Sequence, residues 1–160
     1  MHIFMTGSTG YIGAPLARRL IERGHRLTGL ARSAEAADRM SAAGQTVHRG
    51  DVADAASISQ VLADVDAVIH IAVGLPRGVT EADFSFVEGL IRTLAGTGKP
   101  LILTSGLGVY AGVEEAYVDE TTPLTPPVEI QALRVELEQL VLAASTRQVR
   151  SIVLRPAHVY

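Results

Sequence analysis

The chain has 160 residues, of which 48% are hydrophobic and 19% charged, with a formal net charge of −3; this balance excludes a disordered polyelectrolyte and a nucleic-acid-binding protein. The absence of cysteine excludes disulfide scaffolds, cysteine-based zinc sites and thiol nucleophiles, and no metal site is predicted. Because no apolar run reaches the ~18 residues of a membrane span and the first residues read as a strand rather than a secretory signal, we expect a cytoplasmic protein without a membrane partner.

Short apolar segments alternate with amphipathic helical segments along the whole chain. The segments expected to form strands are residues 2–5, 26–31, 46–49, 67–72, 101–104 and 151–154. The segments expected to form helices are residues 11–23, 33–43, 55–63, 81–95 and 129–145. Short apolar strands that are each followed by a helix are typical of a parallel sheet covered on both faces. We therefore predict an α/β fold with a doubly wound, Rossmann-type sheet of strand order 3-2-1-4-5-6.

The turn after the first predicted strand is rich in glycine and reads TGSTGYIG over residues 6–13. Gly7 permits a tight turn, Gly10 lets the backbone approach a pyrophosphate, and Gly13 allows a helix to pack closely on a strand. The amino end of the following helix favours the negative charge of that pyrophosphate. This position between a strand and a helix predicts a dinucleotide-binding site.

The spacing T-G-x-x-G-x-x-G resembles that of the extended and atypical short-chain dehydrogenase/reductases, also called the NAD-dependent epimerase/dehydratase family. The resemblance continues through GDV at 50–52, HIA at 70–72, LILTSGLGVY at 101–110 and LRPAHVY at 154–160. It implies an NAD(P)-binding domain over residues 1–160, in which these segments hold the adenine, ribose and nicotinamide. Extended relatives carry a substrate-binding region after the sixth strand and form dimers, so the resemblance also implies a longer protein and a homodimer.

The end of the second predicted strand selects between cofactors. NAD sites place Asp or Glu there to bind the ribose 2′-OH, whereas an Arg accommodates the 2′-phosphate of NADP. Here Ala31 is followed by Arg32 and Ser33, and the next carboxylate is Glu35. We therefore expect NADP(H) to be favoured over NAD(H). The residues expected to contact the cofactor are Gly7, Ser8, Thr9, Gly10, Tyr11, Ile12, Gly13, Arg32, Asp51, Val52, Ile71, Ala72, Val73, Thr104 and Pro156.

The usual catalytic pair of this family is absent. Its members carry Tyr-x-x-x-Lys on the helix after the fifth strand, where the tyrosine is a general acid/base whose pKa the lysine lowers. The only lysine of this chain is Lys99, and no tyrosine is followed four residues later by Lys or Arg. Matching the family's Lys-x-x-x-Glu spacing to Arg134 and Glu138 places Ile130 at the tyrosine position. An isoleucine cannot transfer a proton.

Several residues remain as candidates for the missing chemistry. Tyr117 could supply a proton from the long irregular segment 110–128, and His158 at the end of the sixth strand could do so near neutral pH. His70 is a further histidine, although its place within a buried strand favours a structural role. Ser105 could bind a substrate carbonyl or serve the turn, and Arg134 could hold a ribose hydroxyl, bind an anionic substrate or be a solvated helix residue.

The sequence therefore predicts an NADP(H)-dependent oxidoreductase or epimerase/dehydratase-like enzyme, acting on an unspecified small molecule without the Tyr-Lys pair. The alternative is a non-catalytic sensor that reports the NADPH/NADP⁺ ratio to a partner. A third reading is a scaffold whose glycines serve packing alone, which Arg32 and Asp51 argue against because the fold needs neither. An enzyme would close segment 110–128 over its substrate, whereas a sensor would move it between redox states.

Overall fold

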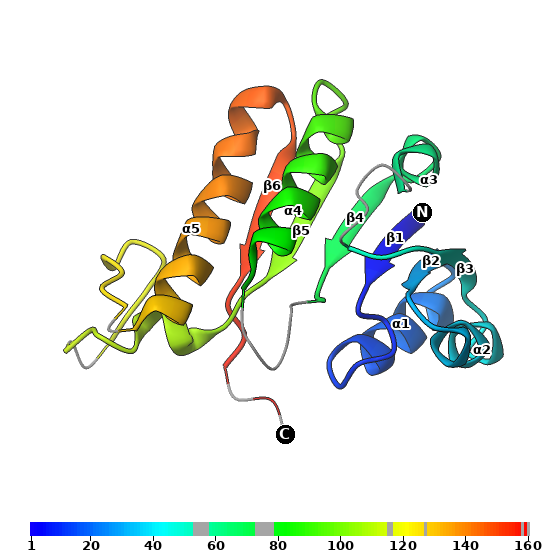
Figure 1. The fold of residues 1–160 in the computed structure, drawn as a ribbon, viewed down its shortest axis with the longest axis horizontal. Coiled ribbons are helices and arrows are strands. Elements are labelled where there is room, and N and C mark those ends of the chain that lie inside the picture. Colours follow the sequence, from blue (N-terminus) through cyan, green and yellow to red (C-terminus); the bar gives the residue numbers. More distant parts are fainter. Residues whose placement is uncertain (53–57, 73–78, 115–116, 127, 158, 160) are drawn as a thin grey trace.

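Six parallel strands form one sheet in the order β3-β2-β1-β4-β5-β6, as predicted. The computed structural model describes residues 1–160 except 53–57, 73–78, 115–116, 127, 158 and 160. The strands are β1 (His2–Thr6), β2 (Arg26–Ala31), β3 (Thr46–Arg49), β4 (Ala67–His70), β5 (Pro100–Thr104) and β6 (Arg150–Leu154). All six run in one direction, so their carboxyl ends share one edge of the sheet (Figure 1).

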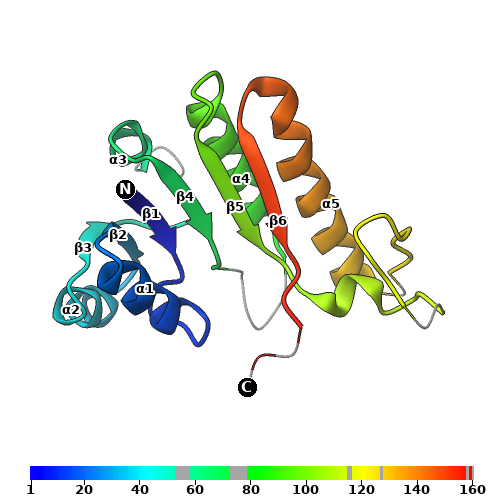
Figure 2. The same ribbon diagram turned by 180° about the vertical axis from the view of Figure 1, so that it is seen from behind.

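Helices cover both faces of this sheet, as a buried parallel sheet requires (Figures 1 and 2). The helices are α1 (Gly13–Glu22), α2 (Ala34–Ala42), α3 (Ser59–Ala63), α4 (Glu81–Leu94) and α5 (Glu129–Ala143), with 3₁₀ turns η2 (Leu107–Tyr110) and η3 (Ala144–Arg147). On one face, α1 packs on Ile3, Met5 and Leu27. On the other face, α3, α4 and α5 enclose a larger core that includes Phe4 and Phe86. None of the helices described is long and apolar enough to cross a membrane.

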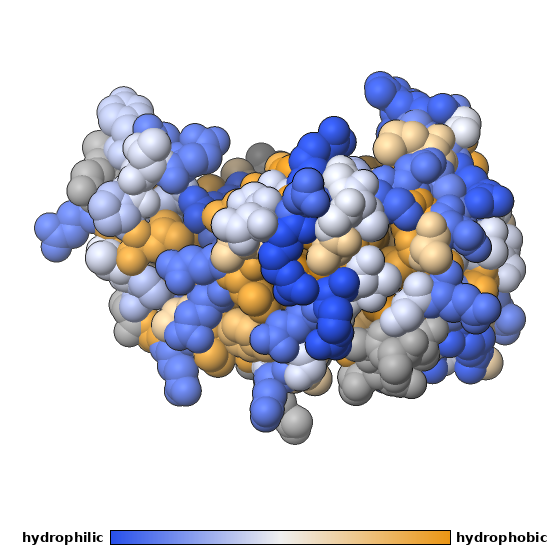
Figure 3. Space-filling model, turned by 90° about the horizontal axis from the view of Figure 1, so that it is seen from above, coloured by the Kyte–Doolittle hydropathy of each residue, from blue (hydrophilic) through white to orange (hydrophobic). Residues whose placement is uncertain are grey.

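The two edges of the sheet differ in what they carry. At the carboxyl edge lie the glycine-rich loop between β1 and α1 and the last residues of the chain (Figure 1). The opposite edge faces the viewer in Figure 3, where hydrophilic and hydrophobic residues are interspersed. Loops at the carboxyl ends of parallel strands are where ligands bind in open α/β sheets. We therefore expect the ligand site at the carboxyl edge, which carries the glycine-rich loop.

Most predicted boundaries differ from the observed ones by one or two residues; α5, for example, ends at Ala143 rather than at residue 145, where the 3₁₀ turn η3 takes over. Helix α1 begins at Gly13 rather than at residue 11, after a tight turn closed by the Gly10 amide and the Gly7 carbonyl (3.0 Å). Strand β4 ends at His70 rather than at residue 72. The amides of Ile71 and Ala72 donate to the Thr6 hydroxyl, each at 3.2 Å. Of the helix predicted at 55–63, residues 55–57 lie outside the described part.

The turn before α1 leaves no room for a side chain at Gly13. A Cβ there would lie 1.9 Å from the Gly7 carbonyl oxygen, so Gly13→Ala must force the loop and helix apart. We expect this substitution to lower the free energy of unfolding by about 1–3 kcal/mol, measured by urea denaturation. Gly106→Ala is the matched control, since Gly106 is extended and no atom of the described residues lies within 4 Å of its Cβ position. An equal loss in both variants would contradict the packing account.

Candidate functional site

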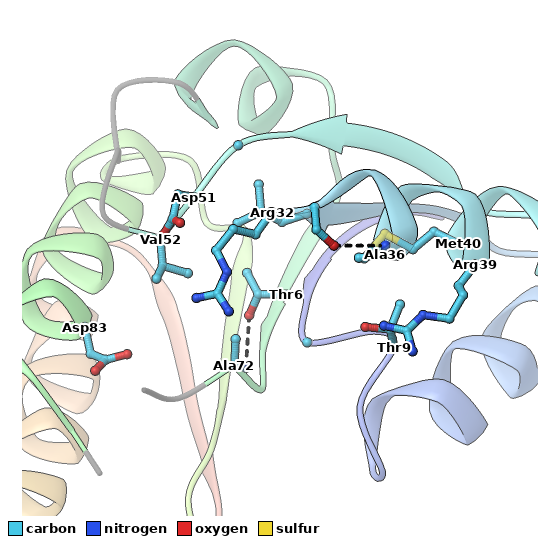
Figure 4. Close-up of a pocket in the computed structure, with 14 residues that line it drawn as sticks. Thr6, Thr9, Arg32, Ala36, Arg39, Met40, Asp51, Val52, Ala72 and Asp83 are labelled. Carbon is cyan, nitrogen blue, oxygen red and sulfur yellow. Dashed lines mark hydrogen bonds between the residues drawn. The ribbon is translucent and has the colours of Figure 1, made fainter. Parts of the chain in front are cut away.

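A cavity of about 320 Å³ opens at the carboxyl ends of β1 and β2 (Figure 4). It gathers six of the residues that the sequence predicted for cofactor binding: Gly7, Thr9, Arg32, Asp51, Val52 and Ala72. Eight further residues line it that were not predicted as cofactor contacts: Thr6, Leu30, Ser33, Ala36, Arg39, Met40, Gly50 and Asp83. The walls of this cavity, the first of two beside the glycine-rich loop, come from segments that follow four different strands and from one face of α2.

The floor of the first cavity is a close crossing of two chain segments. Gly7 has a φ of +73°, and a Cβ there would lie 2.9 Å from the Ala72 amide nitrogen. The neighbouring Thr6 hydroxyl accepts the amides of Ile71 and Ala72 and lies 2.8 Å from His70 Nδ1. Only glycine at position 7 permits this approach without strain. The loop after β1 and the segment after β4 are thus held together at the sheet edge.

Two arginines bring positive charge to the first cavity. Figure 4 shows Arg32 reaching from the end of β2 toward Ala72, whereas Arg39 approaches from α2 on the side of Thr9. The Ser33 hydroxyl caps α2 by accepting the Ala36 amide at 3.1 Å. The Arg39 side chain is 59% exposed and lies 3.9 Å from the Glu35 carboxylate, so its guanidinium is largely free to meet a ligand.

Sequence reasoning missed Arg39, although a signal for it was present. Ala36, Arg39 and Met40 are spaced i, i+3 and i+4, so they share one face of α2. This face of α2 lines the same cavity as Arg32, which lies at the end of β2. A helix was predicted at 33–43, without a role for any of its side chains.

A second cavity, of about 540 Å³, lies on the other side of the glycine-rich loop. Its lining contains four predicted residues, Tyr11, Ile12, Ser105 and Pro156, together with Gly106, Leu107, Gly108, Ala157 and Val159. The Ser105 amide donates to the Leu154 carbonyl at 2.7 Å, which joins the ends of β5 and β6 beneath this cavity.

The glycine-rich loop separates the two cavities, since Gly7 and Thr9 line the first and Tyr11 and Ile12 line the second. A dinucleotide consists of two nucleosides joined by a pyrophosphate, and the unpaired amides of a helix amino terminus bind such a group. Among the described residues, the only atom within 4 Å of a Cβ placed on Gly10 is the Gly7 carbonyl oxygen at 3.3 Å, so the backbone is open to them there. The residues present therefore fit a dinucleotide that crosses the loop.

The remaining predicted residues lie outside these cavity walls. Ser8 is buried beneath the loop, Ile71 packs toward the α1 face, and half-buried Thr104 ends β5. Val73 and His158 lie outside the described residues. Tyr117 is 92% exposed and lines neither cavity, so the structure gives no support to its prediction as a proton donor.

His70 is a buried, neutral histidine. Its ring lies against Phe86, with centroids 5.3 Å apart, and its side chain is bound to Thr6. Because the Thr6 hydroxyl already accepts two amides, its own hydrogen points to His70 Nδ1, which places the histidine proton on Nε2. Burial lowers the pKa of His70 to about 4, against the opposing effect of Asp83. This arrangement fits the structural role that its strand position favoured.

Charged side chains of α4, of α5 and of the segment after β6 interact with one another. Arg155 donates to Glu138 Oε2 from Nη2 at 2.6 Å and from Nε at 3.0 Å, and also to the Tyr110 hydroxyl. Glu138 is 1% exposed. Burial lowers the pKa of Arg134, while the carboxylates of Asp83 and Glu138 act in the opposite direction. Arg134 is therefore part of an interior charge network, and not a solvated helix residue.

The segment predicted to cover a ligand lies on the outer side of the sheet, beside the amino end of α5 (Figure 1). The Tyr110 hydroxyl donates to the Asp119 carbonyl at 2.9 Å, and the Thr125 hydroxyl donates to the Gly112 carbonyl at 3.1 Å. Val118 and Asp119 line a separate cavity of about 530 Å³ with Arg155. In this structure the described part of the segment lines neither cavity beside the glycine-rich loop.

Comparison with known proteins agrees with this geometry. The model of the NAD dependent epimerase/dehydratase family matches residues 3–160. An uncharacterized protein of Schizosaccharomyces pombe is 32% identical and covers 97% of this chain and 52% of its own length. The 4-hydroxy-2-methyl-3-oxo-4-farnesyl-3,4-dihydroquinoline-1-oxide ketoreductase of Stigmatella aurantiaca is 30% identical over 100% of this chain and 51% of its own. The chain thus spans about half the length of these curated relatives.

Among solved structures, a UDP-glucose-4-epimerase from Stenotrophomonas maltophila with bound NAD and formylated UDP-arabinopyranose has a TM-score of 0.81. It is 22% identical, and the match covers 97% of this chain and 52% of that one. Likeness at this identity establishes the fold alone, a Rossmann-type sheet.

The buried His70 predicts a pH dependence of stability. The unfolded histidine gains a proton below its ordinary pKa of 6.5, whereas the folded one resists protonation down to about 4. Stability from this residue is therefore complete above pH 6.5 and is lost as the pH falls toward 4, by up to about 3 kcal/mol. Urea denaturation between pH 7 and pH 4 should show a shallower decline for His70→Gln than for the wild type. His25→Gln, the control, should decline like the wild type; equal slopes in all three proteins would contradict the assignment.

Proposed function

Since this chain belongs to the NAD dependent epimerase/dehydratase family, we propose that it binds NADP(H) in preference to NAD(H) and acts as an oxidoreductase on a carbonyl compound. An epimerase or dehydratase reaction on the same cofactor is the alternative within the family. The ketoreductase name of the relative from Stigmatella aurantiaca supports the first choice. The proposed preference for NADP(H) rests on the two arginines that line the first cavity, Arg32 and Arg39.

Arg32 and Arg39 approach the first cavity from two sides, and Ser33 lines it between them. A guanidinium that binds a phosphate forms a charge-assisted hydrogen bond worth roughly 1.5–3 kcal/mol. At ~1.4 kcal/mol per factor of ten, one such bond gives NADPH about a tenfold to hundredfold advantage over NADH. The residue that follows β2 is Arg32 and not a carboxylate, so no acidic side chain at this position favours a free 2′-OH.

The other cofactor contacts follow from the two cavities. The glycine-rich loop and the amino end of α1 would hold the pyrophosphate, and Asp51 and Val52 would hold the adenine. The nicotinamide would then lie on the side of Tyr11, Ile12 and Pro156. When bound, the reduced cofactor supplies a hydride. The protein's own residues orient the acceptor and stabilise charge on its oxygen.

The missing Tyr-Lys pair gives weight to a second candidate function. Ile130 occupies the tyrosine position, so a proton for the product must come from water or from another residue. A protein that binds NADPH tightly and reduces nothing would fit a sensor of the NADPH/NADP⁺ ratio. Turnover of NADPH in the presence of a ketone separates the enzyme from the sensor.

Calorimetric titration with NADPH and NADH at one ionic strength tests the cofactor preference. We expect NADPH to bind at least ~10-fold more tightly, and Arg32→Ala or Arg39→Ala to weaken NADPH binding by about 10- to 100-fold without changing NADH binding. The control is Arg18→Ala, an arginine of α1 whose side chain is 75% exposed. It should bind both cofactors like the wild type.

Two results would contradict this proposal in different ways. Equal affinity for the two cofactors would remove the 2′-phosphate role of the arginines but keep the dinucleotide site. Failure to bind either cofactor would remove the site itself.

A further inference from the structure

The first cavity carries opposite charges at its two ends. Figure 4 shows Arg39 at one end and Asp83 at the other, with Arg32 between them and Asp51 beside Val52. These two arginines and two aspartates are the only ionisable side chains among the described residues that line the cavity. A ligand that fills this cavity must therefore present an anionic group to the arginines and a different group to the end that holds Asp83.

The Asp83 carboxylate is fixed in orientation by the start of α4. The amide and the hydroxyl of Thr80, the residue before the helix, donate to Asp83 Oδ2 at 2.8 and 2.7 Å. The Thr80 side chain in turn accepts the Asp83 amide, which completes a capping box. Both donors thus reach one carboxylate oxygen, and they hold Asp83 in a place where it is only 2% exposed.

The other oxygen of Asp83, Oδ1, is the one that can serve a ligand. Figure 4 shows the carboxylate directed from α4 into the first cavity, and no hydrogen bond from the described residues reaches Oδ1. An ionised carboxylate only accepts hydrogen bonds. Oδ1 therefore favours a ligand atom that carries a hydrogen and disfavours one that is itself an acceptor.

The charge of Asp83 already has a counterpart inside the protein. Its attraction to Arg134 opposes the effect of burial on the pKa of that arginine. A cation from the ligand is therefore not needed to compensate this buried carboxylate. A neutral N–H or O–H group on the ligand is sufficient, and it avoids burying an additional charge.

NADP(H) offers a group of each required kind within its adenosine part. Its 2′-phosphate is an anion, which the carboxylates repel and the arginines attract. The exocyclic amine of adenine is a neutral donor with two hydrogens, on the base rather than on the ribose. Val52 lies between Asp51 and Asp83 in Figure 4 and gives the flat face of the base an apolar surface. The two ends of the nucleoside therefore match the two ends of the cavity.

We propose that Asp83 is a specificity residue for the base of the cofactor: its Oδ1 accepts a hydrogen bond from the exocyclic amine of adenine. The inference rests on the proposed function, in which NADP(H) occupies the first cavity. The second hydrogen of the amine remains for Asp51, which the family resemblance already assigns to the adenine. Hypoxanthine carries a carbonyl oxygen in place of the amine, so two acceptors would face each other at Asp83.

Calorimetry on the full chain with NADPH and with its hypoxanthine analogue, reduced nicotinamide hypoxanthine dinucleotide phosphate, tests this inference. We expect the wild type to bind NADPH at least ~10-fold more tightly, because the analogue lacks a hydrogen bond to a charged group. In Asp83→Asn the two Thr80 donors keep the side-chain carbonyl in the place of Oδ2, so the NH₂ group faces the base. This group donates to the hypoxanthine oxygen, and the preference for NADPH should disappear or reverse.

Two further variants separate this effect from its alternatives. Asp38→Asn removes the same charge at an exposed position of α2 that does not line the cavity, and it should keep the wild-type preference. Asp51→Asn leaves Asp83 in place and should still bind NADPH more tightly than the analogue. Far-UV circular dichroism reports whether each variant folds, and the Asp51→Asn result decides the question if Asp83→Asn does not fold.

Three results would overturn the inference: equal binding of the two dinucleotides by the wild type, an unchanged preference in Asp83→Asn, or complete loss of the preference in Asp51→Asn. Equal binding of NADPH and NADH would instead remove only the phosphate role of the arginines. Failure of the wild type to bind any of these dinucleotides would overturn the proposed function on which the inference rests.

Discussion

The close crossing of Gly7 with Ala72 is the constraint on which the rest of the site depends. It brings the loop after β1 against the segment after β4 at the edge where all six strands end. The Thr6 hydroxyl fixes the crossing by accepting two amides, and it sets the proton position of His70 in the core below. The backbone of Gly7 and Ala72 and the Thr6 hydroxyl therefore form the floor of the first cavity. Side chains from the end of β2 and from α2 line the first cavity, and residues of η2 line the second.

The sequence was sufficient for the fold because its signals are local. Apolar strands, amphipathic helices and a glycine-rich turn each span fewer than twenty residues, and their alternation permits few topologies. Boundaries such as those predicted at residues 11 and 72 were wrong because they depend on where hydrogen bonds close in three dimensions. Arg39 was missed because its role requires knowing that one face of α2 turns toward the loop after β1.

The interior face of α5 carries charged side chains that are paired within the protein. Relatives with the Tyr-Lys pair place a proton donor and a cation on this helix, whereas here an isoleucine and Arg134 hold those positions. Arg134 lies near Asp83 and Glu138, and Glu138 in turn binds Arg155. The formal charges of this network cancel, and Arg155 lines the cavity beside segment 110–128.

We propose that Arg32 and Arg39 form a site for the 2′-phosphate at the end of β2. Phosphorus NMR of the 2′-phosphate of NADP⁺, titrated with pH in complex with the protein, tests this claim most directly. Two guanidinium groups favour the dianion, so the account predicts that the pKa of the bound 2′-phosphate falls below that of free NADP⁺ and recovers in Arg32→Ala. A bound 2′-phosphate that titrates as in free solution would contradict the account.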